Sequence, residues 1–179
     1  MSESKNKKGF TLVEIMVVIA IIGILAAVVY ASMDTARKKG RDTERKSNLK
    51  QLQAAVELYA QANGAYPSMG CVSGGWGRQN LCGSSGQEYI QGITDIMSLP
   101  FDYKTTSSSQ GYFYRTGTIN GRPAYKIMSY NIVESETVTA NHEFARYPAS
   151  AGCSGDMTST VNTKTYAVYS SNAACELWD

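Results

Sequence analysis

The sequence has little of what most catalytic and metal sites require. It contains one histidine, and its four cysteines never form a CxxC pair, which argues against a zinc site. No GxSxG elbow marks a serine nucleophile. His142 lies in an Asn-His-Glu stretch without an evident metal or triad partner, so we interpret it as a surface-loop residue. We therefore predict a protein that is not an enzyme, with no cofactor and no metal site.

The net charge is small, but it is unevenly distributed along the chain. The formal charge of +2 indicates no particular partner. Residues 1–9 carry three lysines and one glutamate, and residues 34–50 carry seven basic and three acidic residues. Residues 51–179 hold seven basic and ten acidic residues, as expected for a chain whose parts have different surroundings. The basic stretch could face solvent, lipid phosphates, an acidic neighbour or nucleic acid, and the sequence leaves these open.

Residues 10–31 form an almost wholly apolar run that only Glu14 interrupts with a charge. As a helix these residues would extend about 33 Å, enough to cross a bilayer core. The run is long for a secretory signal, and a glutamate is out of place in one, although alanines near its end keep that alternative open. Lysines before the run favour a cytoplasmic N-terminus, but the basic stretch after it opposes that orientation. We predict a single-pass membrane segment.

The same helix is predicted to continue well beyond the apolar run. Residues 37–62 contain no proline, and they carry one apolar stripe at helical spacing. The stripe consists of Leu49, Leu52, Val56 and Tyr59. Asn63-Gly64, followed by Pro67, is a stop signal. A continuous helix over residues 10–62 would be about 80 Å long. A small domain cannot bury that length, so something else must cover its first half.

The remaining residues predict a small sheet after a long loop. Residues 68–95 are rich in Gly, Ser and Asn and read as a loop, with a helical turn near residues 89–97. The strand-like runs are residues 112–116, 124–133 and 164–170, and Asn120-Gly121 predicts a hairpin between the first two. Their tyrosines are interpreted as core residues. The predicted fold class is α+β, a long N-terminal α-helix with a transmembrane first half, packed on a small antiparallel β-sheet head.

All four cysteines lie in the predicted head, at Cys71, Cys82, Cys153 and Cys175. An even number of cysteines in an exported chain favours disulfides. Three pairings are possible, and we predict the local one, Cys71–Cys82 with Cys153–Cys175. Each bond would contribute about 2–4 kcal/mol, mainly by restricting the unfolded chain.

The most informative stretch is KGFTLVE at residues 8–14, which opens the apolar helix. It resembles the class III signal of type IV pilins and type II secretion pseudopilins, and the likeness extends over roughly the first 67 residues. The resemblance implies that a prepilin peptidase cuts between Gly9 and Phe10 and methylates the new N-terminus, giving N-methylphenylalanine. Glycine suits such a cut because it hinders access to the backbone least.

Glu14 is the candidate assembly residue. It lies four residues after Phe10 and so on the same helix face. A carboxylate within a membrane segment costs a few kcal/mol, which marks it as a functional candidate. Its expected partner is the Phe10 amine of the same chain or of a neighbour, and in the resembled family this glutamate pairs with the neighbouring subunit. The alternative is a side chain that reaches the lipid headgroups.

The resemblance implies a homopolymeric filament, or fimbrium, assembled by a platform protein and an ATPase. The chain would be a single-pass membrane protein before assembly, and an extracellular or periplasmic filament afterwards. The implied parts are a leader (1–9), a transmembrane half-helix (10–31), an amphipathic half-helix (32–62) and a head (63–179). The length of the head and its four cysteines favour a pilin.

Two other functions remain as alternatives. One is a pseudopilin for protein secretion, and the other is an anchored binding module that never polymerises. Pseudopilins often hold calcium in a C-terminal loop, but the oxygens of Asp156, Glu176 and Asp179 lack EF-hand spacing, so we assign no calcium site. Adhesion, motility, DNA uptake and secretion are not distinguished, and nucleic acid stays an open partner.

Overall fold

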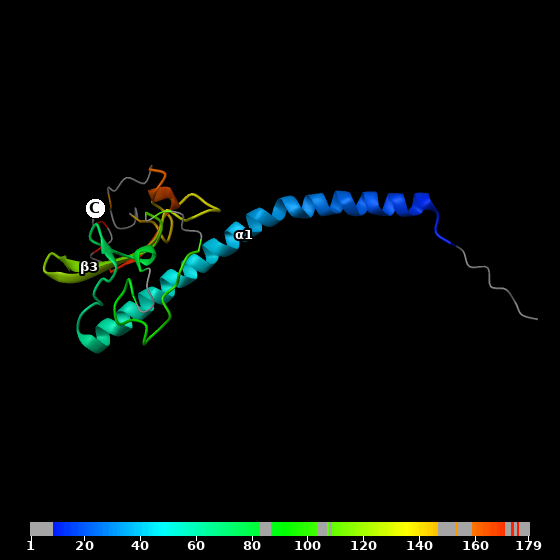
Figure 1. Ribbon diagram of the computed structural model, residues 1–179. Coiled ribbons are helices and arrows are strands. Elements are labelled where there is room, and N and C mark those ends of the chain that lie inside the picture. The colour runs from blue at the N-terminus through cyan, green and yellow to red at the C-terminus, as the bar shows by residue number, and fades with distance from the viewer. Residues whose placement is uncertain are drawn as a thin grey trace, which may run out of the picture. The chain divides into compact units, whose positions relative to one another are not determined.

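The computed structural model describes residues 9–82, 87–103, 107, 109–146, 153, 159–170, 173 and 175 (Figure 1). The chain divides into two compact units, Met1–Lys39 and Gly40–Asp179. The first unit contributes the N-terminal part of one long helix, and the second contains the rest of that helix and the sheet.

Helix α1 covers Leu12–Asn63, close to the predicted limits. It ends where the sequence places the stop signal. Gly64 has a φ of 73°, and its N–H donates to the carbonyl of Ala60 at 2.8 Å. A positive φ is readily available only to glycine, so the helix stops there. Within the described residues, this is the one helix that is long and apolar enough to cross a membrane.

Five antiparallel strands form one sheet, in the order in which they occur along the chain. They are β1 (Val72–Ser73), β2 (Trp76–Arg78), β3 (Gly111–Ile119), β4 (Arg122–Tyr130) and β5 (Tyr166–Tyr169). Short 3-10 helices, η1 (Gln79–Leu81) and η3 (Asn162–Lys164), lie between them. The α+β fold class is confirmed.

The predicted hairpin joins β3 to β4. Asn120 and Gly121 have φ values of 51° and 74°, as a two-residue turn between twisted strands requires. The prediction of a long loop over residues 68–95 was wrong for residues 72–78, because β1 and β2 lie there. Near residues 89–97 the structure shows a single turn, in which the N–H groups of Ile96 and Met97 donate to the Ile93 carbonyl.

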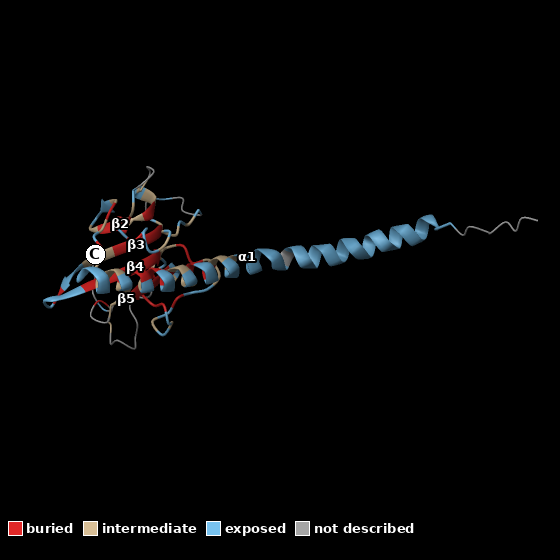
Figure 2. Ribbon diagram, turned by 90° about the horizontal axis from the view of Figure 1, so that it is seen from below, coloured by how far each residue is buried: buried red, intermediate tan, exposed pale blue. Residues whose placement is uncertain are grey.

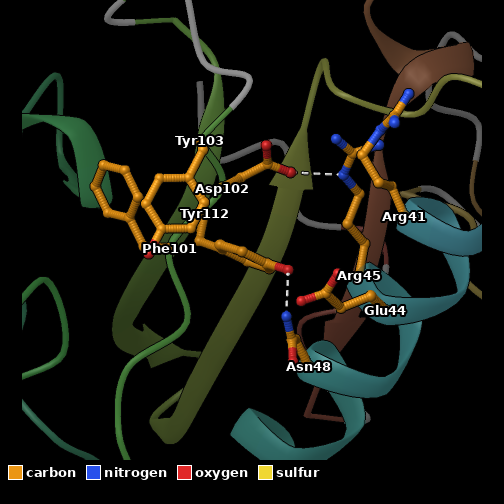
Figure 3. A pocket seen from close by; sticks show the side chains of 8 residues that line it. All are labelled: Arg41, Glu44, Arg45, Asn48, Phe101, Asp102, Tyr103 and Tyr112. Atoms are coloured by element: carbon orange, nitrogen blue, oxygen red, sulfur yellow. Dashed lines mark hydrogen bonds and ion pairs between the residues drawn. The ribbon is translucent and has the colours of Figure 1, made fainter. Parts of the chain in front are cut away.

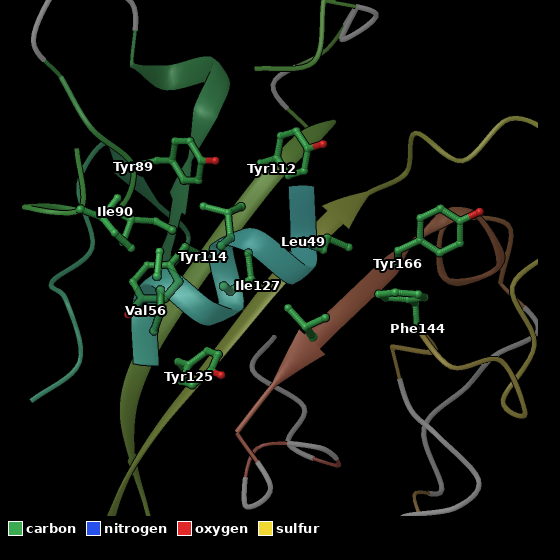
Figure 4. Packing of buried hydrophobic residues seen from close by; sticks show 14 of the residues in the cluster. Leu49, Val56, Tyr89, Ile90, Tyr112, Tyr114, Tyr125, Ile127, Phe144 and Tyr166 are labelled. Atoms are coloured by element: carbon green, nitrogen blue, oxygen red, sulfur yellow. The ribbon is translucent and has the colours of Figure 1, made fainter. Parts of the chain in front are cut away.

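The core lies between α1 and one face of the sheet (Figure 4). The helix contributes Leu49, Leu52 and Val56, all with no exposed area, whereas Tyr59 is only partly buried. The strands contribute alternate residues, which are Tyr112, Tyr114, Tyr125, Ile127, Tyr166 and Val168. Figure 2 shows the strands as the most buried part of the head.

The hydroxyl groups of the buried tyrosines form hydrogen bonds. Tyr114 donates to the Pro67 carbonyl at 2.9 Å, and Tyr125 donates to Glu57 at 2.8 Å. The hydroxyl of Tyr112 accepts from Asn48 at 3.0 Å. A buried hydroxyl without a partner would be costly, so these bonds let large polar rings fill the core.

The head contains the two local disulfides, Cys71–Cys82 and Cys153–Cys175. The first joins residues 11 positions apart and closes the segment that carries β1 and β2. The second joins residues 22 positions apart. Each bond limits the conformations of a short part of the unfolded chain.

Candidate functional site

The residues predicted for processing and assembly lie at the beginning of α1. Gly9 and Phe10 precede the helix, and Phe10 is 84% exposed. A Cβ added at Gly9 would meet no atom within 4 Å, so the backbone there is open. The peptide bond between them is therefore neither helical nor buried, as a protease substrate requires.

Thr11 and Glu14 cap the first turn of α1. The N–H and the hydroxyl of Thr11 both donate to Glu14 Oε2, at 2.8 and 2.7 Å. In return, the N–H of Glu14 donates to Thr11 Oγ1 at 3.3 Å. This reciprocal pattern is a capping box, and it places a carboxylate at the positive end of the helix. The sequence analysis missed Thr11, although T-x-x-E before an apolar run is the signal for it.

The capping box fixes where Glu14 points before any cut is made. In the uncut chain the nitrogen of Phe10 belongs to a peptide bond, so no amine is present to pair with the carboxylate. Cleavage after Gly9 would create that amine one residue before the cap. The Phe10–Glu14 pairing therefore stays a prediction, and the cap is the contact that the structure shows.

In Figure 2 the first part of α1 has the colour of exposed residues along most of its length. Large apolar side chains from Phe10 to Met33 are between 40% and 84% exposed. Burial in a bilayer or against other protein is needed to shield them from water. This surface was predicted from the apolar run.

The basic stretch at residues 34–50 finds most of its partners within the same chain. Lys38 pairs with Asp34 at 2.5 Å. The other pairs join α1 to the segment after β4, and they are Arg41–Glu134 at 2.6 Å, Lys46–Glu136 at 2.5 Å and Lys50–Glu143 at 2.9 Å. The stretch therefore binds the acidic residues of its own head, which leaves less positive charge for a neighbour or nucleic acid than the sequence suggested.

Arg45 is the centre of a buried ionic cluster, and Figure 3 shows its pair with Asp102. Its side chain is 3% exposed and pairs with Asp102 at 2.6 Å, Asp42 at 2.7 Å and Glu134 at 3.0 Å. Burial lowers the pKa of Arg45, but its hydrogen bonds to these carboxylates outweigh that effect and raise the pKa above the ordinary value.

Asp42 extends this cluster to the backbone. It accepts hydrogen bonds from the N–H groups of Glu134 and Ser135, at 3.0 and 2.6 Å. A cavity of about 100 Å³ adjoins the cluster, with Phe101 and Tyr103 at its exposed side. The cluster holds the segment after β4 on the helix.

His142 lies near charged and aromatic groups of the head. Its Nε2 is 3.4 Å from Glu136, its Nδ1 accepts from the N–H of Phe144, and its ring stacks on Tyr166. Among the described residues, no group of three or more His, Cys, Asp or Glu side chains is placed to hold a metal.

The N-terminal segment is similar to known proteins. Residues 4–30 match the model of the prokaryotic N-terminal methylation motif. The chain is 41% identical over 66 residues to the type II secretion system core protein G of Pseudomonas aeruginosa, covering 37% of this chain and 46% of that protein. It is 44% identical over 64 residues to the type IV wide pilus major component PilA4 of Thermus thermophilus, covering 36% and 49%.

A third relative is the type IV major pilin protein PilA of Myxococcus xanthus, 39% identical over 61 residues that cover 34% of this chain and 28% of that protein. The chain thus spans about half of the length of the first relatives, or less. No solved structure matches. With its exposed apolar helix and the N-terminal methylation motif before it, the N-terminal segment of this chain is similar to that of type IV pilins and type II secretion pseudopilins.

Proposed function

We propose that this chain is a structural subunit of a type IV pilus-like filament, cut after Gly9 and polymerised through its N-terminal helix. The observation that carries the proposal is the exposed apolar part of α1, which begins with the Thr11–Glu14 capping box. A simple membrane anchor would need the apolar surface, but it would not need a carboxylate at the first turn.

The exposed helix supplies the driving force for assembly. Once drawn from the membrane, residues 10–31 must be shielded from water. Packing these segments from many copies together would bury most of their apolar surface. At about 25 cal/mol per Å², that burial is worth tens of kcal/mol before entropy costs. Extraction and polymerisation are therefore coupled.

Glu14 would give the assembly its register. In the uncut chain, Oε2 accepts both bonds from Thr11, and Oε1 accepts none from the described residues. The cationic N-terminus that cleavage creates at Phe10, in this chain or its neighbour, can donate to Oε1 while Thr11 keeps Oε2. A charge that is costly in the membrane thus becomes a contact between defined positions.

The partners and the location follow from this role. A prepilin peptidase would process the chain in the inner membrane and N-methylate Phe10. A platform protein and an ATPase would then drive extraction into the filament. The four parts of the chain would be the leader (1–9), the membrane half-helix (10–31), the amphipathic half-helix (32–62) and the head (63–179).

A second candidate is a pseudopilin of a type II secretion system. It is favoured by relatives that carry the name type II secretion system core protein G, such as those of Pseudomonas aeruginosa and Escherichia coli. The two candidates share the processing step and the helix, and they differ in where the polymer ends up. A pilus reaches the cell surface, whereas a pseudopilus stays in the periplasm.

Intact mass spectrometry of sheared surface material and of membranes tests the proposal. We expect sheared material to contain residues 10–179 with one added methyl group and two disulfides. Processed protein found only in membranes would favour the pseudopilin. If residues 1–9 stayed attached in cells with an active prepilin peptidase, the proposal would be wrong.

Substitutions in α1 separate assembly from stability. Glu14→Ala should abolish filaments but leave the protein in the membrane. Glu44→Ala is the matched control, because it removes an exposed carboxylate from the same helix. Filaments that form normally with Glu14→Ala would contradict the assembly role of Glu14.

A further inference from the structure

Two aromatic side chains on the surface of the head are exposed next to each other. Phe101 is 49% exposed and Tyr103 is 90% exposed. The centroids of their rings are 5.2 Å apart, and the ring planes are inclined at 59° (Figure 3). Among the described residues, neither ring has a cation or a further ring against it. Exposed aromatic rings that lie together on a folded domain mark an interaction surface.

The segment that carries the two rings is anchored to the head. Asp102 lies between them in the sequence, and its carboxylate binds Arg45 at 2.6 Å. Its carbonyl accepts from Gln79 Nε2 at 3.1 Å, and the carbonyl of Pro100 accepts from the hydroxyl of Tyr89 at 3.2 Å. Figure 3 shows the Asp102 carboxylate turned towards Arg45, with both rings on its other side. Because the backbone is held, the rings are in position before a ligand arrives, which lowers the entropy cost of binding.

The cavity beside the rings offers hydrogen-bond acceptors. Its volume of about 100 Å³ is smaller than the roughly 300–1,000 Å³ of sites for whole small molecules, so it suits the head group of one side chain. Glu44 and Asn48 line it from α1. Glu44 is exposed and makes no hydrogen bond or ion pair within the described part of the chain. Asn48 donates through its amide nitrogen to Tyr112 at 3.0 Å, which leaves its amide oxygen as an acceptor.

The charged groups around the cavity include more carboxylates than guanidinium groups. On its inner side two arginines and three carboxylates pair with one another, and these are Arg41, Arg45, Asp42, Asp102 and Glu134. Glu44 adds a fourth carboxylate. Because both arginines are already bound to carboxylates, the field in the cavity is negative, so the cavity attracts a cation and repels an anion.

We propose that this cavity binds the guanidinium group of an arginine side chain on a partner protein. The guanidinium plane would stack on the Phe101–Tyr103 pair, and its N–H groups would donate to Glu44 and Asn48. An arginine combines the three features that the cavity matches, which are a positive charge, a planar face and a row of N–H donors. The site does not depend on whether the chain forms a pilus or a pseudopilus.

Two other cations fit the cavity less well. A quaternary ammonium group binds to aromatic rings, but it has no N–H to donate to Glu44 or Asn48. The ammonium group of a lysine donates hydrogen bonds, but it has no planar face to stack on a ring. Both serve as comparison ligands in the test.

Titration of the full-length chain in non-ionic detergent with capped peptides, measured by surface plasmon resonance, tests the proposal. The peptide Gly-Gly-Arg-Gly-Gly should bind more tightly than its lysine counterpart and than choline. A peptide with citrulline, which keeps the shape of arginine without its charge, should bind at least tenfold more weakly, the usual effect of losing a charge-assisted hydrogen bond.

Variants of the cavity give the second part of the test. Glu44→Gln should weaken binding of the arginine peptide about tenfold for the same reason. Tyr103→Ala should weaken it about threefold, the effect of losing a cation–π contact at an exposed site, and Tyr103→Phe should bind normally. Asp95→Asn is the matched control, because it removes an exposed carboxylate of the head that does not line the cavity.

The variants replace exposed side chains, so near-ultraviolet circular dichroism should show an unchanged head. The proposal is overturned if citrulline, lysine or choline binds as tightly as the arginine peptide, or if folded Glu44→Gln binds it normally. It is also overturned if Glu44→Gln lowers the sedimenting mass of the chain, because a second copy would then fill the cavity. Since Glu44→Gln should still form filaments, its loss of peptide binding is independent of any loss of filaments in Glu14→Ala.

Discussion

Replacing Arg45 by methionine tests whether the buried ionic cluster holds the head together. The side chain is 3% exposed and lies within 3.0 Å of the carboxylates of Asp42, Asp102 and Glu134. Methionine preserves much of the volume but leaves these carboxylates without their shared cation. Removing one partner of a buried ion pair costs about 3–5 kcal/mol. Since a domain is stable by about 5–15 kcal/mol, this is a large part of the total.

The measurement is urea unfolding of the full chain in non-ionic detergent, followed by near-ultraviolet circular dichroism of the buried tyrosines. With a slope of about 2 kcal/mol per M, the midpoint should fall by roughly 2 M. Lys50→Met is the matched control. It breaks a pair with Glu143 whose side chains are 60% and 69% exposed, and it should cost less than about 1 kcal/mol.

A second substitution separates the ionic contribution from packing. Adding Asp102→Leu to Arg45→Met removes one stranded carboxylate, so the double variant should be less destabilised than the sum of the single variants. If the free energy of unfolding of Arg45→Met is within about 1 kcal/mol of that of the unchanged chain, the ionic cluster does not stabilise the head as expected.

Three smaller predictions concern the first turn, the acid response and the hairpin. Thr11→Val should weaken the capping box by about 0.5–2 kcal/mol and speed hydrogen exchange of the first helical amides. Thr11→Ser keeps the hydroxyl and should leave the exchange rate unchanged. Equal exchange rates in the two variants would refute the cap. Burial raises the pKa of Glu136, but hydrogen bonds from Lys46 and Tyr166 outweigh this and lower the pKa. The ionised Glu136 therefore stabilises the folded chain fully above the unfolded pKa of about 4.3, and this stabilisation is lost as the pH falls through the lower folded pKa. In Glu136→Gln, the urea midpoint of unfolding should decline less steeply with falling pH below about 4.3 than in the unchanged chain. An equally steep decline in both would contradict this pH dependence. Gly121 has a φ of 74°, so Gly121→Val should lower the free energy of unfolding, measured by thermal unfolding, by about 1–2 kcal/mol. Gly117→Ala should lower it less, because a Cβ added at Gly117 meets no atom within 4 Å.

The features predicted correctly from the sequence are those that depend on neighbouring residues. The helix was predicted because its apolar run and its Asn63-Gly64 stop are local signals. The hairpin was predicted for the same reason, since Asn120-Gly121 supplies two positive φ angles. Strand β2 was missed because its Trp-Gly-Arg sequence lies among glycines, and it becomes a strand by pairing with Phe113 and Tyr114 on β3.

The ionic partners of the basic stretch could not be predicted, because they lie far along the chain. Arg41 binds Glu134, 93 residues away. Only the packing of the head on α1 brings the two together. In the candidate site, Gly9, Phe10 and Glu14 were chosen because KGFTLVE resembles the class III signal, and their roles in processing and assembly stay predictions. Thr11 was overlooked although it stands in the same motif, because Glu14 was considered as a partner for an amine and not as a helix cap.

The position of the ionic cluster also has a mechanical consequence. Gly40 is the first residue of the second compact unit, which contains the head, and Arg41, Asp42 and Arg45 lie just after it. A pulling force transmitted through the backbone of α1 therefore reaches these residues before it reaches Leu49, Leu52 and Val56. Short, directional ion pairs would carry the first load, and the apolar contacts behind them would be strained only after those pairs had broken. The head should thus resist tension at its point of attachment, ahead of its core.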